Sequence, residues 1–121
     1  MLGSEPPPEA QPSPGGPSRE LEVTATAYNS VAAQTSNHPT LTAFGITLRP
    51  GMRIVAVSRD LEGLGLRDGV VLTIVGEDGE WTVGDRMNAR WRRKIDLYMG
   101  DDVQAARAWG ERRVRIRWRD R

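Results

Sequence analysis

Short runs of apolar residues, broken every few positions by glycine, proline or charged side chains, limit what this chain can fold into. Most of these runs alternate apolar with polar residues or are rich in β-branched side chains, as half-buried and buried strands are. The last run, Val114–Trp118, has arginines between its apolar residues and predicts a strand with one charged face. The predicted strands are Leu21–Tyr28, Met52–Val57, Val70–Val75, Trp81–Val83, Ile95–Met99 and Val114–Trp118.

One helix is predicted between the last two strands, at Asp102–Trp109. Asp101 and Gln104, three residues apart, form a capping-box pattern, and Gly110 follows where helices commonly end. Six strands and one short helix within about 100 residues predict a small all-β barrel.

The first 20 residues differ in composition from the rest of the chain. They are rich in proline, glycine, serine and glutamate, and they bury too little apolar surface to offset the entropy of ordering. We interpret residues 1–20 as a flexible tail or linker and residues 21–121 as one folded domain. Because such tails commonly join a domain to an export signal or another module, we hypothesise that the sequence begins after a removed signal.

Composition excludes several classes of function. The chain has no cysteine, which rules out disulfides, zinc–thiolate sites and cysteine nucleophiles. No apolar run approaches the ~20 residues of a membrane helix. Net charge is only +1, but positions 81–121 carry 12 basic and 6 acidic residues. This basic third suits an anionic partner, although a solvated arginine-rich surface is the commoner explanation of such a pattern.

Several segments match the pattern of one bacterial family. They are Thr42–Gly45, Pro50–Gly51, Ile54–Val57, Asp85, Ile95–Tyr98, Trp109–Gly110 and Val114–Ile116. In this order they resemble 3D domains, which are named for three aspartates and include the catalytic domain of membrane-bound lytic transglycosylase A. The resemblance implies a six-stranded double-psi β-barrel, with one short helix before the last strand, that acts on bacterial peptidoglycan.

The resemblance also implies a reaction. A lytic transglycosylase uses one carboxyl group, first as acid and then as base, to cleave the glycan strand and close a 1,6-anhydromuramic acid ring. Asp96 is the implied acid and base. Asp85, 11 positions earlier, and Asp60 are the implied supporting aspartates. No metal or organic cofactor takes part in this reaction.

The chain departs from the family at two places. Arg86–Asn88 follows Asp85 where the family has Asp-x-Gly-Gly, and Ser58 stands at the usual first aspartate, two residues before Asp60. The lost glycines favour a non-catalytic glycan-binding or wall-loosening module, whereas the retained Asp85 and Asp96 favour the enzyme.

An acid at Asp96 requires a pKa raised toward neutrality. Burial beside Leu97 and Tyr98 and the charge of Asp85 would raise the pKa of Asp96, whereas the basic segment 90–94 would lower it. The sequence leaves this balance open. Aspartates at turns and strand ends also commonly cap backbone groups, which is the alternative role for each aspartate.

Further residues are candidate substrate contacts. Trp91 would either stack on a sugar ring or cover the end of the barrel, and the arginines of 86–94 would pair with peptidoglycan carboxylates. His38, the only histidine, is expected to be solvated in its loop. The candidate contacts are Tyr28, Thr42, Gly45, Arg86, Trp91 and Tyr98.

The expected partner is a peptidoglycan glycan strand, bound by a monomer that is exported to the periplasm or cell envelope. No metal, nucleic acid or transmembrane segment is expected. A protein-interaction domain that uses the arginine face of the last strand is the remaining alternative, and it predicts binding that weakens with salt.

Overall fold

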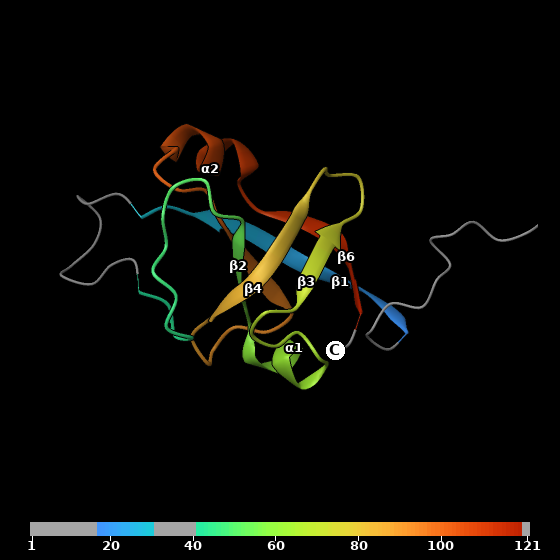
Figure 1. The fold of residues 1–121 in the computed structure, drawn as a ribbon. Coiled ribbons are helices and arrows are strands. Elements are labelled where there is room, and N and C mark those ends of the chain that lie inside the picture. The colour runs from blue at the N-terminus through green and yellow to red at the C-terminus, as the bar shows by residue number, and fades with distance from the viewer. Residues whose placement is uncertain (1–16, 31–40, 120–121) are drawn as a thin grey trace, which may run out of the picture.

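A computed structural model of the chain describes residues 17–30 and 41–119. In these ranges six strands close into a barrel in the order β1-β5-β2-β4-β3-β6 (Figure 1). The expected six-stranded double-psi barrel is confirmed. His38 and most of the proposed tail lie outside the described residues. The strands are β1 (Ser18–Tyr28), β2 (Ile54–Val57), β3 (Val71–Ile74), β4 (Glu80–Arg86), β5 (Lys94–Tyr98) and β6 (Arg112–Arg119).

Two of the neighbouring strand pairs are parallel, β1 with β5 and β2 with β4, and the remaining pairs are antiparallel. Parallel neighbours cannot be joined by a hairpin, so the chain must cross over between them. Two such crossovers give the barrel its double-psi topology. They also bring strands far apart in sequence side by side, so β5 lies between β1 and β2.

The interior of the barrel is filled by alternate residues of the strands. Val23 and Ala25 of β1 are buried there, and so are Ile116 and Trp118 of β6, as the alternation predicted. Residues between them point outward. Among the outward positions, Ile54, Ala56 and Tyr98 are themselves buried, whereas Thr26, Asp85 and Asp96 are partly exposed.

The first strand begins at Ser18, three residues before the predicted start of the domain. These residues lack apolar alternation, but they pair with β6, beginning with Ser18 opposite Arg119. Glu20 stabilises this extension of β1, because its carboxylate forms ion pairs with Arg115 and Arg117. Charge pairing between strands thus extends β1 where the hydrophobic pattern had ended.

The predicted helix is confirmed as α2 (Val103–Trp109), with Gly110 at its end in a left-handed conformation. The predicted cap was one residue early, because Asp102 and not Asp101 accepts a hydrogen bond, from the Ala105 N–H at 2.9 Å. Trp109 fastens α2 to the barrel by donating its indole N–H to the carbonyl of Ala25 at 3.1 Å.

A second helix, α1 (Arg59–Gly63), follows β2 and was not predicted. With five residues it is too short to show helical periodicity, and its only buried side chain is Leu61. No helix among the described residues is long and apolar enough to cross a membrane.

Candidate functional site

A bulge in β4 determines where Asp85 points. Trp81 and Val83 face the barrel interior, so simple alternation would turn Asp85 inward as well. The pairing with β2 shifts here, because Val55 pairs with Val83 whereas the next residue, Ala56, pairs with Asp85. Gly84 is the extra residue, and the bulge turns the Asp85 side chain to the outer face.

Asp85 and Asp96 lie on either side of the same residue. Ala56 pairs with Asp96 on β5 and with Asp85 on β4, and Asp96 pairs in turn with Thr26 on β1. Side chains at paired positions share a face of the sheet, so Thr26, Asp96, Ala56 and Asp85 form one row across four strands, here called the aspartate row. Two strand spacings, about 10 Å, separate the backbones of the two aspartates.

Asp96 is half-buried, and burial raises its pKa. The nearby charge of Asp85 acts in the same direction, whereas a hydrogen bond from the Thr26 hydroxyl at 2.9 Å and the charge of Lys94 act against it. The balance that the sequence left open thus goes toward a raised pKa for Asp96. A carboxyl group in this environment is suited to donate a proton or a neutral hydrogen bond.

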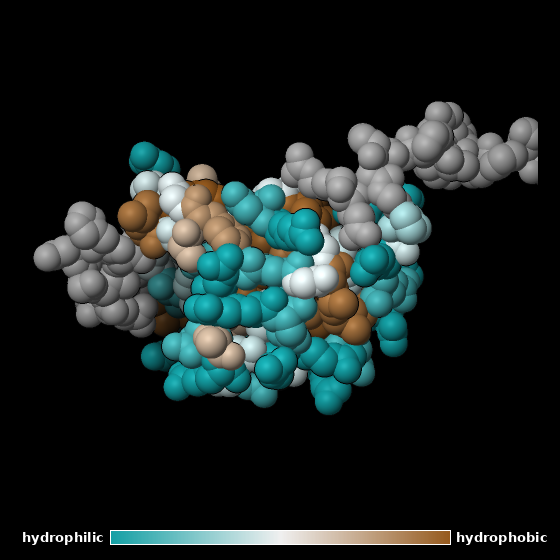
Figure 2. All heavy atoms as spheres, turned by 90° about the horizontal axis from the view of Figure 1, so that it is seen from below, coloured by the Kyte–Doolittle hydropathy of each residue, from teal (hydrophilic) through white to brown (hydrophobic). Residues whose placement is uncertain are grey.

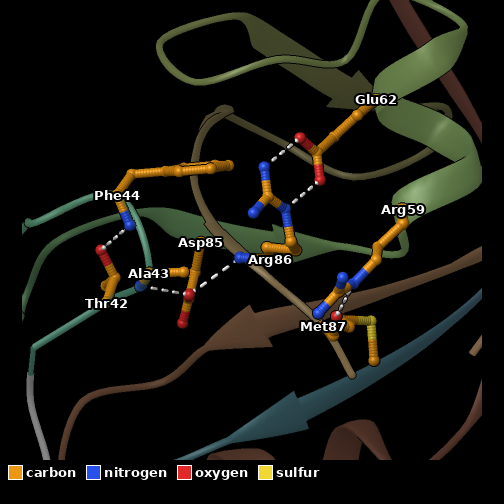
Figure 3. A network of polar contacts seen from close by, with 8 residues as sticks. All are labelled: Thr42, Ala43, Phe44, Arg59, Glu62, Asp85, Arg86 and Met87. Atoms are coloured by element: carbon orange, nitrogen blue, oxygen red, sulfur yellow. Dashed lines mark hydrogen bonds and ion pairs between the residues drawn. The ribbon is translucent and has the colours of Figure 1, made fainter. Parts of the chain in front are cut away.

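Asp85 is held differently (Figure 3). Its Oδ1 accepts hydrogen bonds from the backbone N–H groups of Ala43 and Arg86, each at 2.8 Å. Two backbone donors fix the carboxylate and leave its second oxygen for another partner. The two aspartates therefore sit in distinct environments on one face: Asp96 accepts the Thr26 hydroxyl, and Asp85 is anchored by backbone N–H groups.

Tyr28 and Tyr98 adjoin the aspartate row. They pair across β1 and β5, and their ring centroids lie 5.4 Å apart. Tyr98 is buried, and its hydroxyl is hydrogen-bonded to the Ser30 hydroxyl. The Tyr28 hydroxyl is also buried but finds no hydrogen-bond partner among the described residues. Burial, followed by the charges of Asp85 and Asp96, raises the pKa of Tyr28, so its phenol stays a neutral donor.

Asp60 lies apart from the row. It stands in α1, and its Oδ2 accepts the backbone N–H of Arg93 at 2.9 Å. Burial raises the pKa of Asp60. Hydrogen bonds from Ser58 and from the Arg93 N–H lower this pKa by more, so it lies below its usual value. Within residues 17–30 and 41–119, no hydrogen bond or ion pair joins Asp60 to Asp85 or Asp96. The geometry is that of an aspartate that caps backbone, and a supporting role for Asp60 stays a prediction.

Arg86 points away from Asp85 toward α1 (Figure 3). Its guanidinium forms two hydrogen bonds with the Glu62 carboxylate, at 2.6 and 2.8 Å, and lies 5.2 Å from the centre of the Phe44 ring. The hydrogen bond from Arg86 lowers the pKa of Glu62. Arg86 thus joins β4 to α1, and a substrate contact would have to compete with this pair.

Thr42 and Gly45 shape the segment that anchors Asp85. The buried Thr42 hydroxyl accepts the N–H groups of Phe44 at 3.2 Å and Ile46 at 3.0 Å, and Gly45 takes the left-handed conformation that the tight turn requires. This turn presents the Ala43 N–H to Asp85. Both predicted contacts therefore act on the site through the backbone that they hold.

Trp91 is partly exposed, as predicted, but its ring is not bare. The Lys94 ammonium lies 3.6 Å and the Arg90 guanidinium 4.8 Å from the ring centroid. A sugar that stacked on Trp91 would have to displace one of these cations. Lys94 lowers the pKa of Asp96, as expected of the basic segment 90–94. Thr26 was missed by the sequence analysis, although its position two residues from Tyr28 places it on the outward face of β1.

The arginine face of β6 is extensively paired. Arg113 forms an ion pair with Glu22, and Arg115 and Arg117 form ion pairs with Glu20. Such pairs partly neutralise the surface on which the protein-interaction alternative depends.

A hollow of about 470 Å³ lies elsewhere, beside α1. Seen from the α1 side, the surface is mostly hydrophilic with smaller apolar areas (Figure 2). None of the predicted site residues lines the hollow. No group of three or more acidic or histidine side chains in the described ranges is arranged to hold a metal ion. The lining residues are Arg19, Gly63, Leu64, Gly65, Arg67, Asp68 and Val70.

Comparison with known proteins shows a shared fold. No protein-family model matches the chain, and no curated protein sequence matches it. Among solved structures, an apo expansin from Clavibacter michiganensis superposes with a TM-score of 0.52 and 20% identity over 81% of this chain and 49% of the expansin. The chain thus spans about half of that protein. The Streptomyces papain inhibitor superposes with a TM-score of 0.55 and 20% identity, over 89% of this chain and 98% of the inhibitor.

Proposed function

We propose that this domain binds the glycan strands of bacterial cell walls, as a wall-binding or wall-loosening module, with the sugar chain lying across the aspartate row. The observation that carries the proposal is the position of two partly exposed carboxyl groups, Asp85 and Asp96, on either side of Ala56. Carboxyl groups hydrogen-bond to sugar hydroxyl groups, and the small side chain of Ala56 is buried between these two. The row therefore offers two polar contacts that are separated by one small side chain.

The fold alone does not choose between a glycan and a protein partner, since an expansin and a papain inhibitor share it. The residues beside the row favour a sugar. Tyr28, supported by the buried Tyr98, places a partly exposed ring next to the carboxyl groups, with its phenol hydroxyl buried and unpaired among the described residues. Aromatic rings pack on the apolar faces of sugars while polar groups bind the hydroxyls.

A second candidate is cleavage of the strand by a lytic transglycosylase reaction, and the raised pKa of Asp96 favours it. Protonated Asp96 would give its proton to the glycosidic oxygen as the bond from that oxygen to C1 of the muramic acid breaks. The Asp96 carboxylate would then take the proton of the 6-hydroxyl as O6 bonds to C1. This sequence consumes no water and requires one carboxyl group, which leaves Asp85 to hold the sugar.

One experiment tests both candidates. Purified peptidoglycan is incubated with the wild type and with Asp85→Asn, Asp96→Asn and the control Asp68→Asn, which removes a carboxylate beside α1. Co-sedimentation measures binding, and mass spectrometry identifies released fragments. Binding that Asp85→Asn weakens and Asp68→Asn does not, without products, supports the binding module.

The released products distinguish the enzymatic outcomes. Anhydro-muropeptides from the wild type, absent with Asp96→Asn, would establish cleavage with Asp96 as the acid. Products with reducing ends would indicate hydrolysis, which requires a second catalytic carboxyl group. The absence of both binding and released products would overturn the proposed function.

A further inference from the structure

Trp91 orders two basic side chains. Lys94 is the only lysine of the chain, and its ammonium lies 3.6 Å from the centroid of the Trp91 ring. The Arg90 guanidinium lies 4.8 Å from the same centroid. Contact with an aromatic face holds a cation that would otherwise move freely in solvent. The three residues, here called the cation clamp, therefore present positive charge at a fixed place.

The cation clamp borders the aspartate row. Lys94 begins β5, two residues before Asp96, so the two side chains leave the same face of the strand. The backbone here is fixed against Ser58, because the Lys94 N–H donates to the Ser58 hydroxyl at 3.0 Å and the Ser58 N–H donates to the Lys94 carbonyl at 2.9 Å. A ligand on the row that extends toward the start of β5 must meet the clamp.

The surroundings of Asp96 along β5 differ in chemistry. Toward the end of β5 lie Tyr98 and its partner Tyr28, which pack with apolar residues of the 46–54 segment. Toward its start lie the ammonium of Lys94 and the ring of Trp91. A neutral sugar chain has no group that matches a fixed cation, whereas a carboxylate forms charge-assisted hydrogen bonds with it.

We propose that Lys94 and Arg90, held on Trp91, form a carboxylate subsite through which the aspartate row selects acidic glycans over neutral glycans of the same backbone. This inference rests on the proposed function and names its substrate class. The carboxylate sits either on the sugar itself or on a peptide attached to it. Trp91 is then a positioning residue for the cations and not a platform for the sugar.

Two soluble probes with the same N-acetylated backbone test the selection. One is a neutral chito-oligosaccharide, and the other is a peptidoglycan glycan strand of similar length whose peptides have been removed, which leaves a free lactyl carboxylate on alternate sugars. Calorimetry should give an affinity about tenfold higher for the acidic strand, the gain typical of one charge-assisted contact. Strands that retain their peptides, and oligogalacturonate, distinguish a peptide or ring carboxylate from the lactyl group.

Variants assign the selection to the clamp. Lys94→Gln and Arg90→Gln should each lose most of the preference for the acidic strand, whereas Lys94→Arg should retain it. Arg117→Gln is the matched control, because it removes the same charge from β6, on the far side of β1. Thermal melting of each variant confirms folding. Because Lys94 is the only lysine, the acidic strand should also protect it from acylation, and the neutral probe should not.

The outcomes separate the two proposals. Equal affinity for the two probes, or equal weakening of both by Lys94→Gln, would overturn the carboxylate subsite and leave glycan binding intact. Failure of every glycan probe to bind the wild type would overturn the proposed function itself.

Discussion

Ile46 packs so closely on Gly84 that a β-carbon on Gly84 would lie 2.8 Å from Cδ1 of Ile46. Gly84 is the bulge residue that turns Asp85 outward, and Ile46 belongs to the turn whose Ala43 N–H holds the Asp85 carboxylate. The missing side chain lets this turn lie directly on β4. Asp85 is thus positioned by a glycine next to it and by a segment about 40 residues away.

The first prediction concerns this contact. Gly84→Ala should destabilise the domain by about 1–3 kcal/mol, because the added methyl group overpacks Ile46 and Ile54. It should also weaken glycan binding by displacing Asp85. Urea denaturation and co-sedimentation measure the two effects. Gly63→Ala is the control, since a β-carbon at Gly63 meets no atom within 4 Å. Equal stability of the two variants would contradict the packing argument.

The second prediction follows from the raised pKa of Asp96. A carboxyl group whose pKa is higher in the folded than in the unfolded state contributes stability at low pH that is lost as pH rises through the folded value. Asp96→Asn removes the ionisable group and therefore removes this loss of stability at higher pH. The variant should therefore be more stable than the wild type at pH 7, and the difference should shrink as the pH falls toward about 4.

Urea denaturation across this pH range checks the second prediction. Asp68→Asn, which removes an exposed carboxylate beside the α1 hollow, is the control for the loss of one aspartate. A stability gap for Asp96→Asn that grows on acidification would show that the pKa of Asp96 is lowered in the folded protein.

The third prediction uses the unpaired phenol of Tyr28. Because no described residue pairs with its buried hydroxyl, Tyr28→Phe should leave stability unchanged or raise it by up to about 1 kcal/mol. Glycan affinity should nevertheless fall several-fold if this hydroxyl contacts the sugar. Tyr98→Phe is the matched variant, and it should lose about 1 kcal/mol because the Tyr98 hydroxyl is bonded to Ser30. Binding by Tyr28→Phe at full strength would show that the Tyr28 hydroxyl makes no contact with the sugar.

The fourth prediction concerns the ion pair between Glu62 and Arg86. The pKa of Glu62 is lowered, so this pair stabilises the domain above the unfolded pKa of Glu62, and the stabilisation is lost as pH falls through the folded value. Glu62→Gln should cost at most about 1 kcal/mol at pH 7, and less in 1 M salt, because the pair is partly exposed.

A looser pair provides the comparison. Glu77 and Arg112 lie 3.8 Å apart with both side chains more exposed than Glu62, so Glu77→Gln should have a smaller effect. An equal cost for both variants in thermal melting would mean that geometry does not determine the strength of these pairs.

The strands could be predicted because each shows its pattern locally. The alternation of Val114–Trp118 with arginines is a property of neighbouring residues, and β6 forms where it predicts. The direction of Asp85 could not be predicted in this way. Asp85 is an even number of positions from Trp81 and Val83, which face inward, so alternation alone predicts an inward Asp85. Only the pairing with β2 reveals the bulge.

Contacts between distant residues were equally beyond the sequence. Thr26 and Asp96 are 70 positions apart and meet because β1 and β5 are parallel neighbours. The resemblance grouped Asp60 with Asp85 and Asp96 by order along the chain. Asp60 instead lies in a helix too short to show a pattern, with its carboxylate on the backbone of Arg93.

The pairing of Ser18 with Arg119 has a mechanical consequence. The two ends of the folded domain leave it side by side, from antiparallel strands that hydrogen-bond to each other. A force that pulls the ends apart would therefore open the β1–β6 seam one residue pair at a time, like a zipper, at low load. A force applied between one end and the aspartate row would instead load several strand pairs together, because the row spans four neighbouring strands.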